Sequence, residues 1–193
     1  MTVDASDRPN DRYGYSVYAG VLLAPAGMNR TVQALRDKIR PQRAMLPAHV
    51  TVKGTFCDIK SLEVVDRLFA EVVSTQSAPF IRLEAPRVKV MKNASVLAVV
   101  RTTELVAIYD DFRAALGPIV TDAYGYDAQG YTPHLTLWEE CPPENLDLAR
   151  KLARDIKLGD GFTAYEVSLV GRIGPAHGGR WTTVKTYRLG GAP

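Results

Sequence analysis

Alternation of apolar and polar residues marks two short stretches of the chain. The first is HVTVKGTF, residues 49–56, and the second is HLTLW, residues 134–138. A period of two is typical of a strand that is buried on one face. Both stretches begin with the same pattern of histidine, apolar residue, threonine, apolar residue, so the two strands are predicted to be related.

The alternation also predicts which side chains lie together, because residues two and four positions apart share one face of a strand. These residues are His49, Thr51 and Lys53 in the first stretch and His134, Thr136 and Trp138 in the second. Each strand should therefore present an imidazole beside a hydroxyl. The third histidine, His177, has no threonine two positions on and is interpreted as a surface residue.

The rest of the pattern alternates between predicted strands and predicted helices. Strands are expected at 15–25, 80–91, 95–102, 162–173 and 180–189, in addition to the two histidine strands. Helices are expected after the N-caps Asn29, Ser61 and Thr103 and after the Pro142–Pro143 pair. Pro86 predicts a bulge or break within its strand.

Each half of the chain thus follows the order strand, helix, histidine strand, helix, strand. We therefore predict an α+β fold of two pseudo-symmetric, duplicated β-α-β lobes, with helices on the outer faces and a central cleft. Residues 1–12 are expected to be a disordered leader. Residues 13–193 should form a single bilobal domain, with the repeat boundary near 92–94.

Composition narrows the class of protein. Of the 193 residues, 46% are hydrophobic and 23% are charged, and the net charge is +3. These values are ordinary for a soluble globular protein and too weakly basic for one that coats nucleic acid. The two cysteines are far apart, and no signal peptide or membrane-spanning run is evident, so we expect a reduced, cytoplasmic protein without a membrane partner.

Two imidazoles at one site can divide acid and base roles near neutral pH. The threonine hydroxyls can bind phosphate oxygens, and Lys53 either supplies a positive charge for the phosphate or is a charge at a strand edge. Trp138 and Tyr131 are candidates for stacking on a base, and core packing is the alternative for both. Such a site suits phosphoryl transfer by in-line attack of water or of a 2′-hydroxyl.

Paired histidines are also used to bind metals, but a catalytic metal needs a third ligand nearby. The residue two positions after each histidine is threonine, which is a poor ligand. No nucleophile elbow, Walker loop or G-x-G-x-x-G motif is present either. We therefore expect neither a metal nor another cofactor.

With both tetrapeptides in view, the chain resembles the two-histidine (2H) phosphoesterase superfamily, which includes 2′-5′ RNA ligase-like proteins and cyclic phosphodiesterases. That group is defined by two H-x-[ST]-x motifs about half a chain apart, and residues 49–52 and 134–137 match them. Pro133 and Phe56 add to the likeness. The resemblance implies a bilobal α+β fold in which His49 and His134 are catalytic.

The resemblance further implies metal-independent hydrolysis of a 2′,3′-cyclic phosphate on a nucleotide or RNA end, or reversible 2′-5′ joining. Thr51 and Thr136 would then hold the phosphate. A module that binds a nucleotide or RNA phosphate without turning it over is the alternative. No obligate protein partner is expected. The substrate, the direction of the reaction, the acid and base assignments and the oligomeric state stay open at this stage.

Overall fold

The computed structural model describes residues 8–39, 45–91, 94–125, 130–139, 141–175 and 179–190. The first seven residues of the predicted leader, the centre of the predicted repeat boundary at 92–93 and His177 lie outside these ranges.

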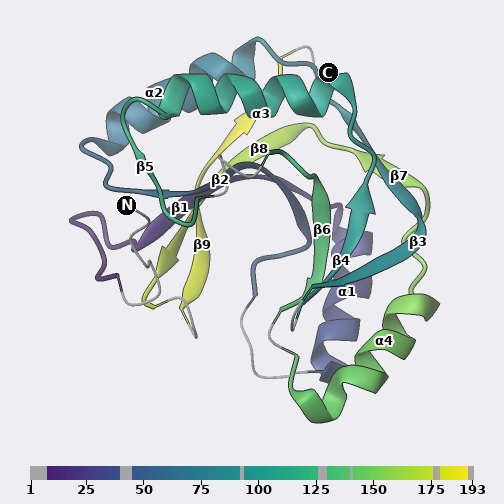
Figure 1. Cartoon of the computed structure of the whole chain (residues 1–193). Helices are drawn as coiled ribbons and strands as arrows, with labels where there is room; N and C mark the ends of the chain where they lie inside the picture. The colour runs from purple at the N-terminus through teal and green to yellow at the C-terminus, as the bar shows by residue number, and fades with distance from the viewer. Residues whose placement is uncertain are drawn as a thin grey trace.

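The chain alternates between strands and helices along its length (Figure 1). The strands are β1 (Val17–Leu23), β2 (His49–Cys57), β3 (Phe80–Met91), β4 (Ala94–Val99), β5 (Thr121–Asp122), β6 (His134–Trp138), β7 (Gly161–Thr163), β8 (Glu166–Ile173) and β9 (Arg180–Arg188). The helices are α1 (Ala26–Ile39), α2 (Leu62–Ser74), α3 (Thr103–Leu116), α4 (Leu146–Asp155) and the 3-10 turn η2 (Pro143–Asn145).

The strands form one antiparallel sheet in the order β7-β3-β4-β6-β2-β1-β8-β9, with β5 paired to β2. The sheet curls into a half-barrel (Figure 1). The histidine strands β2 and β6 are neighbours near its middle. Strands from both halves of the sequence therefore meet at the centre of the sheet.

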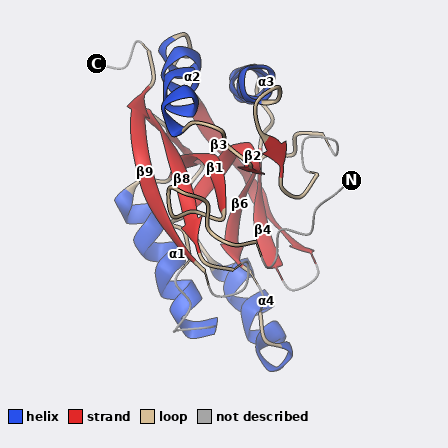
Figure 2. Cartoon of the chain, turned by 90° about the vertical axis from the view of Figure 1, so that its left-hand side faces the viewer, coloured by secondary structure: helices blue, strands red, loops and turns tan. Residues whose placement is uncertain are grey.

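Helices cover one face of the sheet in two pairs (Figure 2). The pair α2 and α3 packs against β9 and β2, and the pair α1 and α4 packs against β6 and β3. The α+β class with helices on the outer face is confirmed. No helix within the described ranges is both long enough and apolar enough to span a membrane.

The helix-covered face holds the main core. Its centre is a run of aromatic rings, in which Phe69 of α2 lies 4.6 Å from Phe112 of α3 and 5.4 Å from Tyr187 of β9, measured between ring centroids. Tyr18 and Phe56 of neighbouring strands continue this packing at 5.7 Å. The apolar positions of the alternating strands face this core, which leaves the other face of the sheet for the polar positions.

Several predicted elements differ in detail. Ser61 is confirmed as a cap, since its hydroxyl accepts a hydrogen bond from the Val64 amide at 3.3 Å. The helix α3 is capped by Thr102, not by Thr103. The predicted strand 162–173 is divided into β7 and β8. The bulge expected at Pro86 is confirmed by a register shift in β3.

Part of the predicted leader makes specific contacts. The Asp11 carboxylate accepts hydrogen bonds from the Tyr13 and Tyr15 amides and from the Tyr18 hydroxyl. Arg8 pairs with Asp58 at the end of β2. These bonds attach residues 8–12 to the strands beside them.

Candidate active site

Antiparallel pairing of β2 with β6 brings the two histidine motifs together. Val50 lies directly opposite Leu135. In such a pair, the residues on either side of this position are also opposite each other, so His49 faces Thr136 and Thr51 faces His134. The two histidines and two threonines therefore form a square on one face of the sheet, and each histidine has a threonine of the other motif as its neighbour.

The apolar residues between them anchor this square from below. Val50 and Leu135 have no exposed surface and belong to the core under the helices. Because successive side chains of a strand point to opposite faces, their burial directs the histidines and threonines to the face away from the helices. The predicted faces of His49, Thr51, His134 and Thr136 are thus confirmed.

Both imidazoles are oriented by the same kind of hydrogen bond. Nδ1 of His49 lies 2.7 Å from the carbonyl oxygen of Pro47, and Nδ1 of His134 lies 2.9 Å from that of Thr132. A carbonyl oxygen only accepts, so each Nδ1 carries the proton and donates it. In a neutral ring Nε2 then has the free lone pair, which leaves it as the nitrogen that can exchange a proton with a substrate.

The electrostatic surroundings of His49 favour its neutral form. Burial lowers the pKa of its imidazole to about 4, and the nearby charges of Arg36 and His134 act in the same direction. The hydrogen bond to the Pro47 carbonyl opposes this shift but does not cancel it. The imidazole of His49 is therefore neutral at neutral pH.

Arg36 is a buried residue of this region that the sequence analysis did not identify. Its side chain extends from α1 and donates three hydrogen bonds of 2.8 Å, to the carbonyls of Leu46, Thr136 and Leu137. Only 3% of the residue is exposed. One guanidinium therefore links the segment before His49 to the strand that carries His134, and fixes their relative position.

A sequence signal for Arg36 was available. The residue lies within the apolar stripe of its helix, four positions after Val32 and one after Leu35, both of which are buried. A charged residue in such a stripe needs buried hydrogen-bond partners.

Asn29 has a different role from the one predicted. The helix begins at Ala26, so Asn29 lies within its first turns and is not its cap. Its side-chain oxygen instead accepts a hydrogen bond from the Ala48 amide at 2.9 Å. The Ala48 carbonyl in turn accepts from the Ala24 amide. These two bonds hold the backbone immediately before His49.

The prediction that Lys53 shares a face with His49 is wrong. Thr51 pairs with Val21, but Lys53 pairs with Gly20, so one extra residue is inserted in β2 and the alternation is broken. Lys53 is fully buried, and its ammonium lies 6.0 Å from the centroid of the Phe56 ring on the helix side. The predicted role of Lys53 in binding the phosphate therefore has no geometric support.

Trp138 leaves the histidine face for the same physical reason. The register between β4 and β6 shifts just before Trp138, at the position that corresponds to Lys53 in the first motif. Trp138 is 3% exposed and belongs to the helix-side core. The prediction that it shares a face with His134 is wrong, and core packing, the alternative interpretation, describes its position.

Tyr131 lies between the two motifs and is half-buried. Its hydroxyl donates a 3.1 Å hydrogen bond to the Thr51 carbonyl. Its ring stacks on Tyr109 of α3, with 4.3 Å between centroids and 7° between planes, so one face of the ring is already covered. Burial raises the pKa of its hydroxyl, which stays a donor at neutral pH. Tyr131 thus ties the segment before His134 to the strand of His49.

Within the described ranges, no group of three or more histidine, cysteine, aspartate or glutamate side chains is placed to hold a metal ion. The two cysteines, Cys57 and Cys141, are buried free thiols. The chemistry visible on this face is therefore that of two imidazoles and two hydroxyls.

Comparison with solved structures places the fold in a known class. A protein of Thermus thermophilus, TT0787, matches with a TM-score of 0.63 and 14% identity, over 91% of this chain and 100% of that one. E. coli LigT complexed with NADP+ matches with a TM-score of 0.59 and 14% identity, over 95% and 99% of the two chains. A structure described as a phosphoesterase gives 0.57 and 15%, over 90% and 98%. At these identities the likeness establishes the fold.

The family follows from the sequence match. The model of the 2′-5′ RNA ligase superfamily matches residues 24–174, which is most of the chain and includes both histidine motifs. The chain therefore belongs to the 2′-5′ RNA ligase superfamily. No curated protein matches the sequence significantly.

Proposed function

We propose that this protein is a metal-independent phosphoesterase that hydrolyses a 2′,3′-cyclic phosphate on a nucleotide or RNA end. The observation that carries the proposal is the pairing of β2 with β6, which sets His49 and His134 beside each other's threonines. Two imidazoles, each oriented through Nδ1 and with Nε2 left for the substrate, suit a reaction that moves one proton in and one proton out.

In the proposed reaction His49 is the base, because its lowered pKa keeps it neutral. Its Nε2 takes a proton from water as the water oxygen bonds to phosphorus. The bond from phosphorus to one ribose oxygen breaks, and protonated His134 donates its Nε2 proton to that oxygen. The products are a phosphate monoester and a free ribose hydroxyl, and the histidines have exchanged protonation states.

The threonines bind the phosphate in this proposal. Thr51 and Thr136 lie diagonally across the square, so their hydroxyls can donate to the two non-bridging oxygens of one phosphate. Thr136 is 7% exposed, and its backbone carbonyl is held by Arg36. In 2′-5′ joining, a ribose 5′-hydroxyl would take the place of water and use the same four residues. Its oxygen bonds to phosphorus as it gives its proton to His49, and the bond from phosphorus to the 3′ oxygen breaks as His134 protonates that oxygen, which leaves a 2′-5′ linkage.

Nucleotides are the proposed ligand class. Structures of E. coli LigT, which shares the fold, hold 3′-AMP, NADP+ and ATP. A ribose phosphate is common to these ligands and to the proposed substrate. The small net charge of +3 also favours a nucleotide or a short RNA end over a long nucleic acid.

The test is turnover of nucleoside 2′,3′-cyclic monophosphates, in EDTA, by the wild type and by His49→Gln and His134→Gln. His177→Gln serves as the matched histidine control. General acid and base groups typically contribute about 10²–10⁴-fold each, so kcat should fall by that much in the first two variants only. Activity that persists in both His49→Gln and His134→Gln would refute the proposal. A wild-type protein that binds the nucleotide but does not turn it over would be a binding module.

A further inference from the structure

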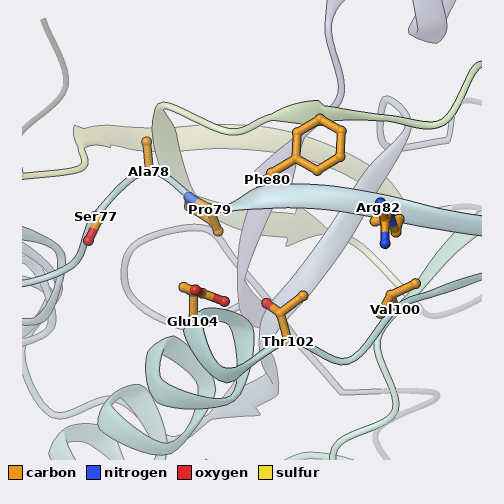
Figure 3. Close-up of a pocket in the computed structure, with 8 residues that line it drawn as sticks. All are labelled: Ser77, Ala78, Pro79, Phe80, Arg82, Val100, Thr102 and Glu104. Atoms are coloured by element: carbon orange, nitrogen blue, oxygen red, sulfur yellow. The ribbon is translucent and has the colours of Figure 1, made fainter.

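A cavity of about 400 Å³ lies between the start of β3 and the start of α3 (Figure 3). Phe80 and Arg82 of β3 line it on one side, and Val100, Thr102 and Glu104 line it on the other (Figure 3). None of these residues takes part in the chemistry proposed above.

The strand pairings place two of the lining residues, Arg82 and Val100, on the same face of the sheet as the histidines. Ala98 of β4 lies opposite His134. Val100 follows two positions along and therefore shares that face. The Val100 amide donates a 2.8 Å hydrogen bond to the Arg82 carbonyl, which brings Arg82 beside it. The alternate residues Leu83 and Val99 are buried in the helix-side core.

The separation follows from strand geometry. Arg82 is two strands away from His134 and one pair of residues further along. At about 4.8 Å between strands and about 6.6 Å for two residues, their Cα atoms are about 12 Å apart along the sheet. At this distance the cavity is within reach of a nucleoside linked to the one that carries the cyclic phosphate.

The side chains of the cavity suit a neutral, flat group. The Phe80 side is open, since 50% of this residue is exposed. Arg82 carries a positive charge, and Glu104 carries a negative one, because its own amide and the Thr102 hydroxyl lower the pKa of its carboxyl. Opposite charges on the two walls disfavour a second free phosphate. They can instead bind the polar edge of a base or a ribose diol, while Phe80 stacks on the ring.

We propose that the Phe80–Arg82 cavity binds the nucleoside on the 5′ side of the cyclic phosphate, so that the preferred substrate is at least a dinucleotide. This inference rests on the proposed function for its reaction, but the binding step can be measured separately. A nucleotide that ends in a 2′,3′-cyclic phosphate is linked to the rest of its chain only through its 5′ oxygen. The neighbouring nucleoside therefore has a single direction in which to extend.

The experiment compares two substrates, adenosine 2′,3′-cyclic monophosphate and the adenosine dinucleotide that ends in the same cyclic phosphate. The quantity measured is the ratio of their kcat/KM values in the wild type and in Phe80→Ala, Phe80→Trp and Arg82→Ala. Tyr165→Ala is the matched control, because Tyr165 is also 50% exposed and does not line the cavity.

We expect the dinucleotide to be preferred by at least fivefold, which is about the lower limit for stacking of one base on an aromatic ring. The preference should fall toward one in Phe80→Ala, persist in Phe80→Trp and Tyr165→Ala, and weaken in Arg82→Ala. A wild type without preference, or a preference that survives in both alanine variants at residues 80 and 82, would overturn the inference.

Failure of the proposed function gives a different result. If neither substrate is turned over, the affinities of adenosine 3′-monophosphate and of the dinucleotide 3′-phosphate are compared by calorimetry. A dinucleotide that binds at least fivefold tighter, with the advantage lost in Phe80→Ala, would support the cavity assignment without the reaction. Equal affinities, together with the absence of turnover, would overturn both the proposed reaction and the assignment of the cavity.

Discussion

Replacement of Arg36 by methionine is the most informative single change in the region of the histidines. The substitution keeps an unbranched apolar side chain but removes three hydrogen bonds of 2.8 Å to the carbonyls of Leu46, Thr136 and Leu137. Each buried acceptor left without a donor costs about 1–3 kcal/mol, or about 6 kcal/mol for the three together.

Part of that cost is recovered, because the buried charge disappears as well. Burial lowers the pKa of the Arg36 guanidinium from 12.5 to about 10. A pKa difference of that size corresponds to about 3 kcal/mol. The expected net loss in the free energy of unfolding is therefore about 3 kcal/mol, which in a chain of this size lowers the melting temperature by about 6–12 °C.

The assay is thermal unfolding of Arg36→Met beside Arg30→Met, a change on the same helix at an exposed arginine. The control should stay within about 0.5 kcal/mol of the wild type. A second readout is the NMR titration of His49, whose pKa should rise in Arg36→Met because the guanidinium charge lowers it. A melting temperature within about 2 °C of the wild type, together with an unchanged His49 titration, would refute the linking role of Arg36.

Three further predictions concern the strands β1 and β2. Gly20→Ala should lower the free energy of unfolding in urea by about 1–3 kcal/mol, since the added Cβ would lie 3.2 Å from Lys53 Cβ and from the Phe69 ring. The control Gly27→Ala has room for its Cβ and should stabilise α1 by up to about 1 kcal/mol. Equal effects of the two changes would contradict this packing. The pKa of His49 is lowered by burial to about 4 from 6.5, so as pH falls between these values the unfolded chain takes up the proton first and the free energy of unfolding decreases. His49→Gln should lack this part of the pH dependence, and a titration of His49 near 6.5 would disprove it. Lys53→Met should leave the affinity for inorganic phosphate unchanged in calorimetry, because Lys53 lies on the helix side, and a tenfold loss would restore its predicted role.

The sequence was sufficient for the parts of the site that depend on local alternation. His49 and Thr51 are two positions apart in a short strand, as are His134 and Thr136, so a period of two assigns each pair to one face. The burial of Val50 and Leu135 confirms that assignment. The repeated motif predicted that the two strands are related, and the register adds that they pair directly, with Val50 opposite Leu135.

The sequence was not sufficient where the side-chain direction depends on a neighbouring strand. Lys53 and Trp138 both follow extra residues whose insertion is visible only in the register with β1 and with β4. A bulge of this kind reverses the side chains that follow it until the register shifts again, and alternation alone does not reveal it. Lys53 also has room on the helix side because its partner there is Gly20, which has no side chain.

Long-range contacts account for the remaining differences. Arg36 bonds to backbone about 100 residues further along the chain, and Asn29 bonds to backbone 19 residues further along. Capping preference correctly marks asparagine as a residue that seeks backbone groups, but it does not say which ones. The capping preference therefore predicted correctly that the Asn29 side chain binds a backbone amide, but the amide belongs to Ala48 and not to the start of its own helix.

The arrangement of the helices affects how the chain can be divided. The helix α1 connects β1 to β2 but packs against β6, and α3 follows β4 but packs against β2. Each half of the sequence thus supplies the cover for a strand of the other half. Two fragments cut between β3 and β4 would each expose an uncovered apolar sheet and would be expected to reassemble with each other. Since each fragment carries one of the two motif histidines, the proposed catalysis would return only on reassembly, which makes that activity a direct reporter of fragment complementation.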